Sequence, residues 1–308
     1  MKDLGKKAEG IRRLKERGLF TRRLLFFTEL PSEEDFKKRL GQEGFKDGDH
    51  IAVRFSSPKE AIHLPRSVLI ESIDRAYKFL KENMGEDLVA IIHDFITPEF
   101  SGAIFMKGKK IYVNLLPGAW ESLHAKSCDQ ILFEGNSATA WFSPNKKEAL
   151  FVDGERLIKK EVEIPREKFL ELISFIYDRI KNLNLEEKTL YEFMLTKDKE
   201  LQVVEAKSKD DFDFSEFGGK EEVHEVSTPG DIEKWNNKQE ILLSVPLDRH
   251  DDLVLHQLIE KIKPHKDKVY VRYGICSHPC IVLREFGIKT IPYNEDIEVL
   301  EVDLNDSS

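Results

Sequence analysis

The sequence predicts two domains of mixed α/β structure: an α+β domain over residues 1–207 and a smaller α/β domain over residues 239–308. Three observations lead to this prediction. A chain of 308 residues is longer than one hydrophobic core usually supports. Short β segments follow one another in the middle of the chain, whereas strands and helices alternate towards its end. Between these parts, residues 208–238 are polar and acid-rich and contain Gly218-Gly219, which is typical of a linker.

Apolar spacing and turn residues predict the elements of the larger domain. Apolar side chains at helical spacing indicate a first helix over residues 3–18, which Gly18 ends. Ser32 is the expected N-cap of a helix that ends near Gly41, because acidic residues fill its first turn. The other expected helices cover 67–83 and 166–182. The expected strands are rich in aliphatic and aromatic residues and cover 24–27, 50–54, 88–95, 101–106, 110–115, 138–143, 148–152, 189–195 and 200–206.

The smaller domain is predicted by a different pattern, in which strands alternate with helices. The expected strands are 240–247, 268–273 and 289–292, and the expected helices are 250–262 and 279–286. This order is typical of a compact βαβαβ unit.

Composition narrows the classes of function. Lys and Arg number 48 and Asp and Glu number 57, and the resulting net charge of −9 argues against a protein that binds the nucleic-acid backbone. No apolar run is long enough to cross a bilayer, so no membrane partner is expected. Three cysteines, an odd number, indicate a reducing compartment, and a cytoplasmic protein is therefore expected.

The segment from Gly274 to Ile288 carries the clearest chemical signal. A strand ends at Gly274, Pro279 fits the first helical position, and Gly287 fits the residue that closes a helix. His278 is therefore expected at the N-terminal end of a short helix. Free backbone N–H groups and the helix dipole favour an anion there and disfavour an imidazolium, so a neutral His278 is suited to attack phosphorus and carry a phosphoryl group.

Two other interpretations of this histidine stay open. His278 is also suited to cap the helix without taking part in any chemistry. Cys276, His278 and Cys280 together suggest a metal site, although no second Cys/His pair accompanies them.

The same segment resembles the phosphohistidine motif of phosphoenolpyruvate synthase, pyruvate phosphate dikinase and the rifampin phosphotransferases. Its usual form is Gly-Gly-x-Thr-Ser-His-Ala-Ala-Ile-Val-Ala-Arg-Glu-Leu-Gly-Ile-Pro. The residues in common are Gly274, Ser277, His278, Ile281, Val282, Arg284, Glu285, Gly287 and Ile288. The chain departs from the motif at Tyr273, Cys276, Pro279, Cys280 and Lys289. The resemblance implies a swivelling domain on which His278 carries the phosphoryl group, with Ser277 and Arg284 in the same catalytic segment.

The N-terminal part is similar to the ATP-grasp domain of that family, with its motifs in the same order. The matching segments are Leu4–Ile11, Ile51–Ser57, Ser101–Phe105, Pro117–Leu123, Tyr191–Phe193 and Val204–Lys207. The resemblance covers most of the chain. It implies an ATP-grasp-like domain that binds ATP and Mg²⁺, followed by the swivelling domain.

The resemblance also implies which side chains bind the nucleotide. Lys7, Arg54 and Lys207 would contact the phosphates, since cationic side chains bind phosphate oxygens and Arg does so through two bonds. His93 stands on a strand that lines the nucleotide pocket, where the family usually has Gln. Simpler interpretations stay open: Lys7 as a solvated charge, Arg54 in a structural ion pair, and His93 as a core or rim residue.

Glu192 and Glu205 are the expected metal ligands. They lie on strands expected to be adjacent, and Mg²⁺ prefers carboxylate oxygens while keeping several waters. Glu205 and Lys207 replace a Gln and an Arg of the family pattern, so a second bidentate phosphate contact is not expected. The alternative is that the two glutamates form the polar face of a hairpin and bind no metal.

Together these features predict an ATP-dependent phosphotransferase that passes a phosphoryl group through His278 to an unidentified acceptor. Two departures support a rival, a nucleotide-binding or regulatory homologue without turnover. Residues 55–66 lack the glycine loop that closes over the phosphates in the family, and the pyruvate-binding barrel is not expected after residue 308. A third possibility is that a separate chain supplies the acceptor domain.

Overall fold

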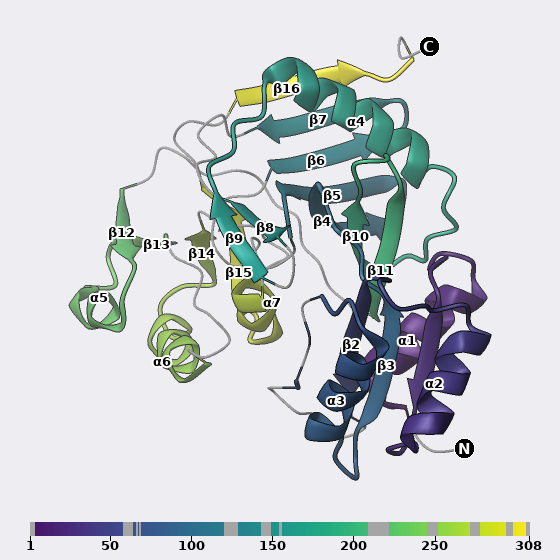
Figure 1. Ribbon diagram of the computed structural model, residues 1–308. Helices are drawn as coiled ribbons and strands as arrows, with labels where there is room; N and C mark the ends of the chain where they lie inside the picture. Colours follow the sequence, from purple (N-terminus) through teal and green to yellow (C-terminus); the bar gives the residue numbers. More distant parts are fainter. Residues whose placement is uncertain are drawn as a thin grey trace. The chain divides into compact units, whose positions relative to one another are not determined.

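A computed structural model describes residues 4–57, 64–65, 67, 69–119, 129–142, 149–153, 156–208, 222–244, 252–271, 278–293 and 298–305 (Figure 1). The chain forms two compact units, each built from several segments. The first unit comprises Met1–Glu99, Phe151–Ile158 and Tyr191–Lys207, and the second comprises Phe100–Leu150, Lys159–Leu190 and Ser208–Ser308. Residues 1–207 are therefore shared between the two units. In the described part of the chain, no helix has the length and apolar character needed to span a membrane.

The first unit contains a three-stranded antiparallel sheet in the order β1-β3-β2. Its strands are β1 (Leu24–Phe27), β2 (Ile51–Ser56) and β3 (Val89–Asp94), and its helices are α1 (Gly5–Glu16), α2 (Glu33–Gln42) and α3 (Ile73–Asn83). The expected N-cap of α2 is confirmed, because the Ser32 side chain accepts a hydrogen bond from the Asp35 N–H. The helix expected from residue 67 begins only at Ile73, because Ile70 still pairs with Ile51.

The two faces of this sheet are covered by different helices. Phe27, Val53 and Ile92 belong to an apolar cluster with residues of α2 and α3. Side chains alternate along a strand, so Arg54, Ser56 and other intervening residues face the opposite side. On that side α1 contacts the sheet, and the N–H of Ala8 donates to Ser56 Oγ at 3.1 Å.

A hairpin provides the last part of the first unit. Its strands β10 (Thr189–Leu195) and β11 (Leu201–Ser208) are neighbours, as the sequence predicts. In the turn, Lys199 has a φ of 58° and the N–H of Thr196 donates to the Glu200 carbonyl at 3.0 Å. A shorter two-stranded sheet pairs β8 (Ala149–Asp153) with β9 (Arg156–Lys160).

The second unit contains an antiparallel array in the order β4-β5-β6-β7-β16. Its strands are β4 (Phe100–Lys107), β5 (Lys110–Pro117), β6 (Asp129–Glu134), β7 (Ser137–Phe142) and β16 (Glu298–Asp303). Helix α4 (Arg166–Ile180) lies across these strands (Figure 1) and packs on one face of the array. The ring of Phe169 stacks on Phe142 with centroids 4.6 Å apart, and Tyr177 contacts Phe133.

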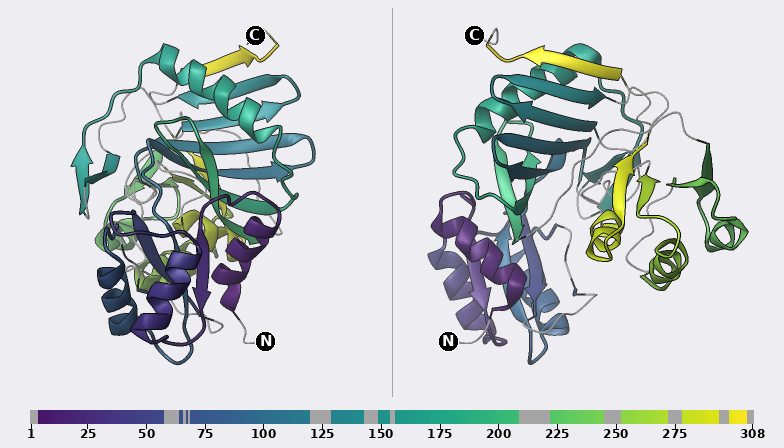
Figure 2. Two further views of the ribbon diagram at one scale, coloured as in Figure 1. Left: turned by 45° about the vertical axis from the view of Figure 1, so that its right-hand side comes forward. Right: turned by 180° about the vertical axis from the view of Figure 1, so that it is seen from behind.

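The C-terminal part of the second unit is a parallel sheet in the order β12-β13-β14-β15. Its elements are β12 (Val223–Val226), α5 (Pro229–Lys234), β13 (Glu240–Leu243), α6 (Asp252–Ile262), β14 (Lys268–Val271), α7 (His278–Glu285) and β15 (Lys289–Pro292). The three helices contribute to one apolar cluster with the strands, and Figure 2 shows them along one side of the sheet. The predicted strands and helices after residue 239 are confirmed, and β12 and α5 add a further βα pair inside residues 208–238.

The sequence did not predict β16. After β15 the chain returns to the antiparallel array, where β16 pairs with β7 over six residues, from Glu298 opposite Phe142 to Asp303 opposite Ser137. Residues 293–297 alone separate the two strands. The C-terminal end of the parallel sheet is therefore attached to the antiparallel array.

Replacement of Gly10 by Ala is expected to destabilise the first unit, although Ala favours a helix more than Gly does. A Cβ at Gly10 of α1 would lie 2.9 Å from the backbone oxygen of Ala206 in β11, so the helix would have to move away. We expect the free energy of unfolding, measured by urea denaturation, to fall by about 1–3 kcal/mol.

Gly41→Ala is the matched control for this change. Gly41 also lies in a helix, α2, but a Cβ there would meet nothing within 4 Å. This variant should gain up to about 1 kcal/mol. An equal gain for Gly10→Ala would show that α1 does not approach β11 closely.

Candidate functional site

Three of the side chains expected to bind a nucleotide and one expected metal ligand come together in the first unit. Lys7 lies on α1, Arg54 on β2, His93 on β3 and Glu205 on β11. The Lys7 Nζ is 3.1 Å from Glu205 Oε2. The charges of Arg54 and Lys7 both act on His93. The structure therefore brings two cations, one carboxylate and one imidazole to the α1 side of the sheet.

The start of α1 explains the position of Lys7. Gly5 has a φ of 75°, and a Cβ there would lie 2.4 Å from the Ser57 carbonyl oxygen. Only glycine allows this approach, which brings the first turn of the helix against the end of β2. Ser56 Oγ accepts from the Ala8 N–H and so satisfies one of the free donors of that turn. Lys7 is thereby held beside β2 and β11.

Sheet register explains why Arg54 and His93 are neighbours. His93 pairs with Ala52, and Arg54 pairs with Ile91. Residues paired across antiparallel strands point to the same face, as do residues two apart on one strand. Arg54 and His93 are therefore diagonal neighbours on the face that α1 covers.

His93 is neutral, and its tautomer is determined by its partner. Burial, together with the charges of Arg54 and Lys7, lowers the pKa of His93 to about 4. Its Nδ1 is 2.7 Å from the carbonyl oxygen of Asp94, which can only accept, so Nδ1 carries the proton. Nε2 consequently presents a lone pair to a hydrogen-bond donor. The edge of the Phe20 ring contacts the imidazole, with centroids 5.9 Å apart.

The two carboxylates expected to hold a cation lie on neighbouring strands. Glu192 on β10 is 7% exposed, and Glu205 lies on the neighbouring strand β11. In the described residues no group of three or more His, Cys, Asp or Glu side chains has the geometry of a metal site. Mg²⁺ at nucleotide sites takes one or two carboxylates and completes its shell with phosphate oxygens and water, so each of these side chains is of the kind that Mg²⁺ prefers.

The remaining expected site residues are described only in part. Lys207 lies on β11 and His278 is the first residue of α7, but their side chains lie outside the described part, as does all of Ser277. The predicted start of the helix and its closing glycine are confirmed, because Gly287 has a φ of 78°. Arg284 donates to Thr290 Oγ1 at 2.5 Å, a contact that ties α7 to β15.

The alternative metal site at Cys276, His278 and Cys280 gains no support. Cys280 forms no disulfide and is fully buried in the apolar cluster under α7, at 0% exposure. A buried thiol of this kind behaves as a small apolar side chain. Cys276 lies outside the described residues, as does Cys128.

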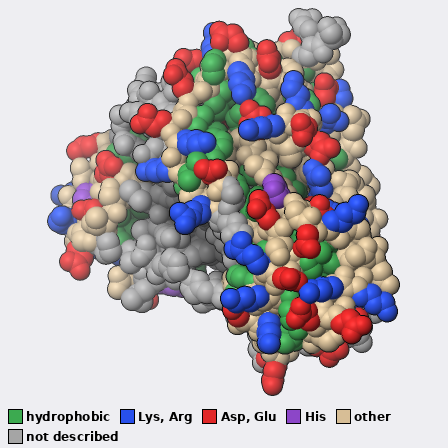
Figure 3. Space-filling view, viewed as in Figure 1, with side chains coloured by type: hydrophobic (Ala, Val, Ile, Leu, Met, Phe, Trp, Pro, Cys, Tyr) green, Lys and Arg blue, Asp and Glu red, His purple; other side chains and the backbone are tan. Residues whose placement is uncertain are grey.

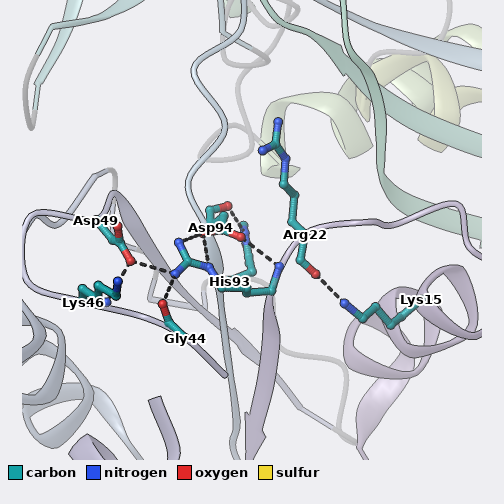
Figure 4. A network of polar contacts seen from close by, with 8 residues as sticks. Lys15, Arg22, Gly44, Lys46, Asp49, His93 and Asp94 are labelled. Atoms are coloured by element: carbon teal, nitrogen blue, oxygen red, sulfur yellow. Dashed lines mark hydrogen bonds and ion pairs between the residues drawn. The ribbon is translucent and has the colours of Figure 1, made fainter. Parts of the chain in front are cut away.

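The sequence did not predict a charged network beside His93 (Figure 4). Arg23 donates from Nε to Asp94 Oδ1 at 2.9 Å and from Nη1 to Asp49 Oδ2 at 2.7 Å. Its hydrogen bond to Asp94 is the main reason that the pKa of Arg23 is raised. With Arg22 and His50 these residues line an open pocket of about 460 Å³. The network fixes the end of β3, and hence the carbonyl that orients His93.

Elsewhere on the surface, charges of both signs are mixed. Figure 3 shows Lys and Arg interspersed with Asp and Glu over the viewed face, without a continuous basic stripe. This distribution agrees with the acidic net charge of −9.

Comparison with known proteins gives no family. No protein-family model and no curated protein matches the chain. Similar solved structures include D-alanyl-alanine synthetase A from Vibrio cholerae (15% identity, TM-score 0.35, covering 67% of this chain and 55% of that one). A second is an L-amino acid ligase from Bacillus licheniformis, with 12% identity and a TM-score of 0.36, covering 67% of this chain and 43% of that one. A third is N5-carboxyaminoimidazole synthetase from Staphylococcus aureus complexed with ADP, with 13% identity and a TM-score of 0.31, covering 67% of this chain and 44% of that one.

These likenesses are too small to assign a fold or an activity. The chain spans about half the length of the structures it matches, with 55% of the first covered. The resemblance to the phosphoenolpyruvate synthase family rests on the residues of the sequence alone.

Replacing Arg54 by Met should raise the pKa of His93, because a nearby cation disfavours the imidazolium. A pH titration of the His93 ring by NMR measures this pKa directly. Arg39→Met is the matched control, since Arg39 lies over Phe27, whose side chain is in the apolar cluster on the opposite face of the same sheet. An unchanged pKa in Arg54→Met would contradict the proximity of the two side chains.

The same shift makes folding stability depend on pH. The folded pKa of about 4 lies below the ordinary value of 6.5, so the unfolded chain binds the proton more readily. The contribution of His93 to the free energy of unfolding is complete above pH 6.5 and is lost as the pH falls towards 4. His93→Gln should remove that part of the pH dependence of the denaturation midpoint.

Proposed function

We propose that the chain is an ATP-dependent phosphotransferase of ATP-grasp type that passes a phosphoryl group through His278 to a second substrate. The observation that carries the proposal is the convergence of Lys7, Arg54 and Glu205 around a neutral His93. The resemblance of the sequence to the phosphoenolpyruvate synthase family supports the role of His278.

The ion pair between Lys7 and Glu205 suits a site that receives a charged ligand. Without nucleotide, each side chain neutralises the other at 3.1 Å. Phosphate oxygens would bind the Lys7 ammonium, and a cation bound to the phosphates would bind the Glu205 carboxylate. The Lys7 ammonium and the Glu205 carboxylate would then each exchange one oppositely charged partner for another. Arg54 would add a two-pronged contact, and a neutral His93 Nε2 would accept from a donor on the ligand or its bound water.

Glu192 and Glu205 would hold Mg²⁺. The ion would neutralise part of the charge that develops on the transferring phosphoryl group. The chain itself contributes the positions of its cations, which are fixed before the ligand arrives by the contact of α1 with β2 and β11. Preorganised charges of this kind supply most of the catalysis in phosphoryl transfer.

The proposed transfer uses the lone pair of an imidazole nitrogen of His278. This nitrogen attacks the β-phosphorus of ATP, the bond between the β-phosphorus and the bridging α–β oxygen breaks, and AMP leaves with the electron pair. The γ-phosphate then passes to water and is released, which leaves phospho-His278 to donate to the second substrate. The position of His278 at the start of α7 supports this role, because free backbone N–H groups stabilise the transferred anion.

A second candidate, a nucleotide-binding protein without turnover, is favoured by the attachment of β16. A phosphoryl carrier has to travel, yet residues 293–297 and the six-residue pairing with β7 tie the parallel sheet to the antiparallel array. A fully extended chain spans at most about 3.6 Å per residue, so this connection keeps the end of β15 within about 20 Å of the start of β16 while β16 stays paired.

Incubation with ATP labelled at the β-phosphate distinguishes the two candidates. Transfer through His278 predicts acid-labile, base-stable label on the wild-type protein and none on His278→Ala. His256→Ala is the matched control, because His256 is an exposed histidine on α6 in the same unit and should leave labelling intact. Lys7→Met should weaken ATP binding by about 10-fold or more, as expected for the loss of a charge-assisted contact.

Absence of label on the wild-type protein, with ATP binding intact by calorimetry, would rule out the phosphotransferase. That result would leave the nucleotide-binding protein. Label that persists on His278→Ala would place the carrier at another residue.

A further inference from the structure

One edge of the antiparallel array has no partner strand within the described part of the chain. Strand β16 stands at the end of the strand order, next to β7. Figure 2 shows it as the outermost strand of the array. The backbone N–H and C=O groups of every second residue point away from the neighbouring strand, so an edge strand offers them to a further strand. β16 is therefore a place where another extended chain can add.

The two faces of β16 differ in what covers them. Glu298 lies opposite Phe142, whose ring stacks on α4, and its carboxylate is 3.7 Å from the Arg166 Nε on that helix. Side chains alternate along a strand, so Glu298 and the buried Leu300 share the face that α4 covers. The side chains that point to the other face are those of Val299, Glu301 and Asp303.

Val299 favours the addition of a further strand. It is 57% exposed, more than any other large apolar side chain in the described residues. It lies opposite Trp141, which is half-buried on β7. Apolar and aromatic side chains opposite one another stabilise paired strands, and β-branched residues favour the extended conformation. An apolar side chain on an added strand would cover Val299 and continue this cross-strand contact.

The charges of this edge match a basic partner. Glu301 and Asp303 are exposed on the same face as Val299, and β16 itself contains no Lys or Arg. Elsewhere in the array a cross-strand ion pair joins the Lys110 Nζ of β5 to the Glu134 Oε2 of β6 at 3.2 Å. A Lys or Arg opposite Glu301 or Asp303 on an added strand would make the same kind of contact.

A second copy of this chain fits the edge poorly. Its own β16 would bring the carboxylates of Glu298, Glu301 and Asp303 against the same three groups, and like charges opposite each other destabilise strand pairing. We propose that the outer edge of β16 binds an extended basic segment of a partner protein, which adds to the array as a further strand. Main-chain hydrogen bonds supply the affinity, and alternate Lys or Arg side chains of the partner supply the specificity.

A capped peptide of sequence Thr-Lys-Thr-Lys-Thr-Val-Thr tests the proposal. In an antiparallel pairing its lysines lie opposite Asp303 and Glu301, and its valine lies opposite Val299. The peptide is added to the full chain, and hydrogen exchange of the β16 amides is followed by NMR. We expect slower exchange at every second amide of β16, those that point away from β7, and unchanged exchange at the others. A peptide with Glu in place of both lysines should not bind.

The double variant Glu301→Gln with Asp303→Asn tests the role of the charges. It removes both carboxylates but keeps side-chain oxygens that can accept the hydrogen bonds made there. We expect the dissociation constant of the basic peptide to rise by about 5-fold or more, and its dependence on salt concentration to weaken. Glu167→Gln with Glu171→Gln is the matched control, because it removes two exposed charges from α4, on the other face of the array. This control should bind the peptide as the wild type does.

Three results would overturn the proposal: equal binding of the Lys and Glu peptides, binding that leaves the exchange of the β16 amides unchanged, and no binding to the wild-type chain. Self-association of the chain with slower exchange at the same amides would also overturn it, and would assign the edge to a second copy. Failure of the proposed phosphotransfer is a separate result, because the edge shares no residue with the site that contains Lys7, Arg54 and His93.

Discussion

The close approach of α1 to two strands is the constraint on which the candidate site depends. Gly5 brings the start of the helix against the Ser57 carbonyl, and Gly10 brings its middle against that of Ala206. A larger side chain at either position would move the helix outward. Lys7 lies between these two glycines, so the approach that packs the helix also brings its ammonium group to Glu205. The close packing of α1 therefore also determines which charges meet in this unit.

The charges around His93 are balanced in a way that favours an incoming anion. Burial and two cations, Arg54 and Lys7, depress the pKa of the imidazole, which therefore adds no third positive charge. The Arg23 network holds Asp94 from the other side, and the Asp94 carbonyl fixes which ring nitrogen bears the proton. Because the imidazole is neutral, the two cations can bind acidic phosphates while His93 Nε2 accepts from a hydrogen-bond donor of the same ligand.

Local signals in the sequence were sufficient for elements whose ends are determined by nearby residues. Ser32 and Gly287 define their helix ends through contacts three to five residues away, and both were predictable. Pairings between distant segments were not predictable. The β16 strand looks like an exposed tail until β7 is placed beside it. Arg23 finds Asp49 and Asp94 only after three segments have folded together. The polar composition of residues 208–238 concealed β12 and α5 because a short edge strand needs few apolar residues.

The same distinction between local signals and distant pairings applies to the candidate site and to the movement of a phosphoryl carrier. Motif order indicated Lys7, Arg54 and Glu205, but the sequence contained no sign that β16 attaches the C-terminal end of the parallel sheet to β7. With β16 paired, residues 293–297 keep the end of β15 close to the start of β16. A larger movement requires six residues of an edge strand to unpair from β7, which exposes backbone groups on both strands. A phosphoryl carrier in this fold therefore either turns about this connection or draws its range from the release of β16.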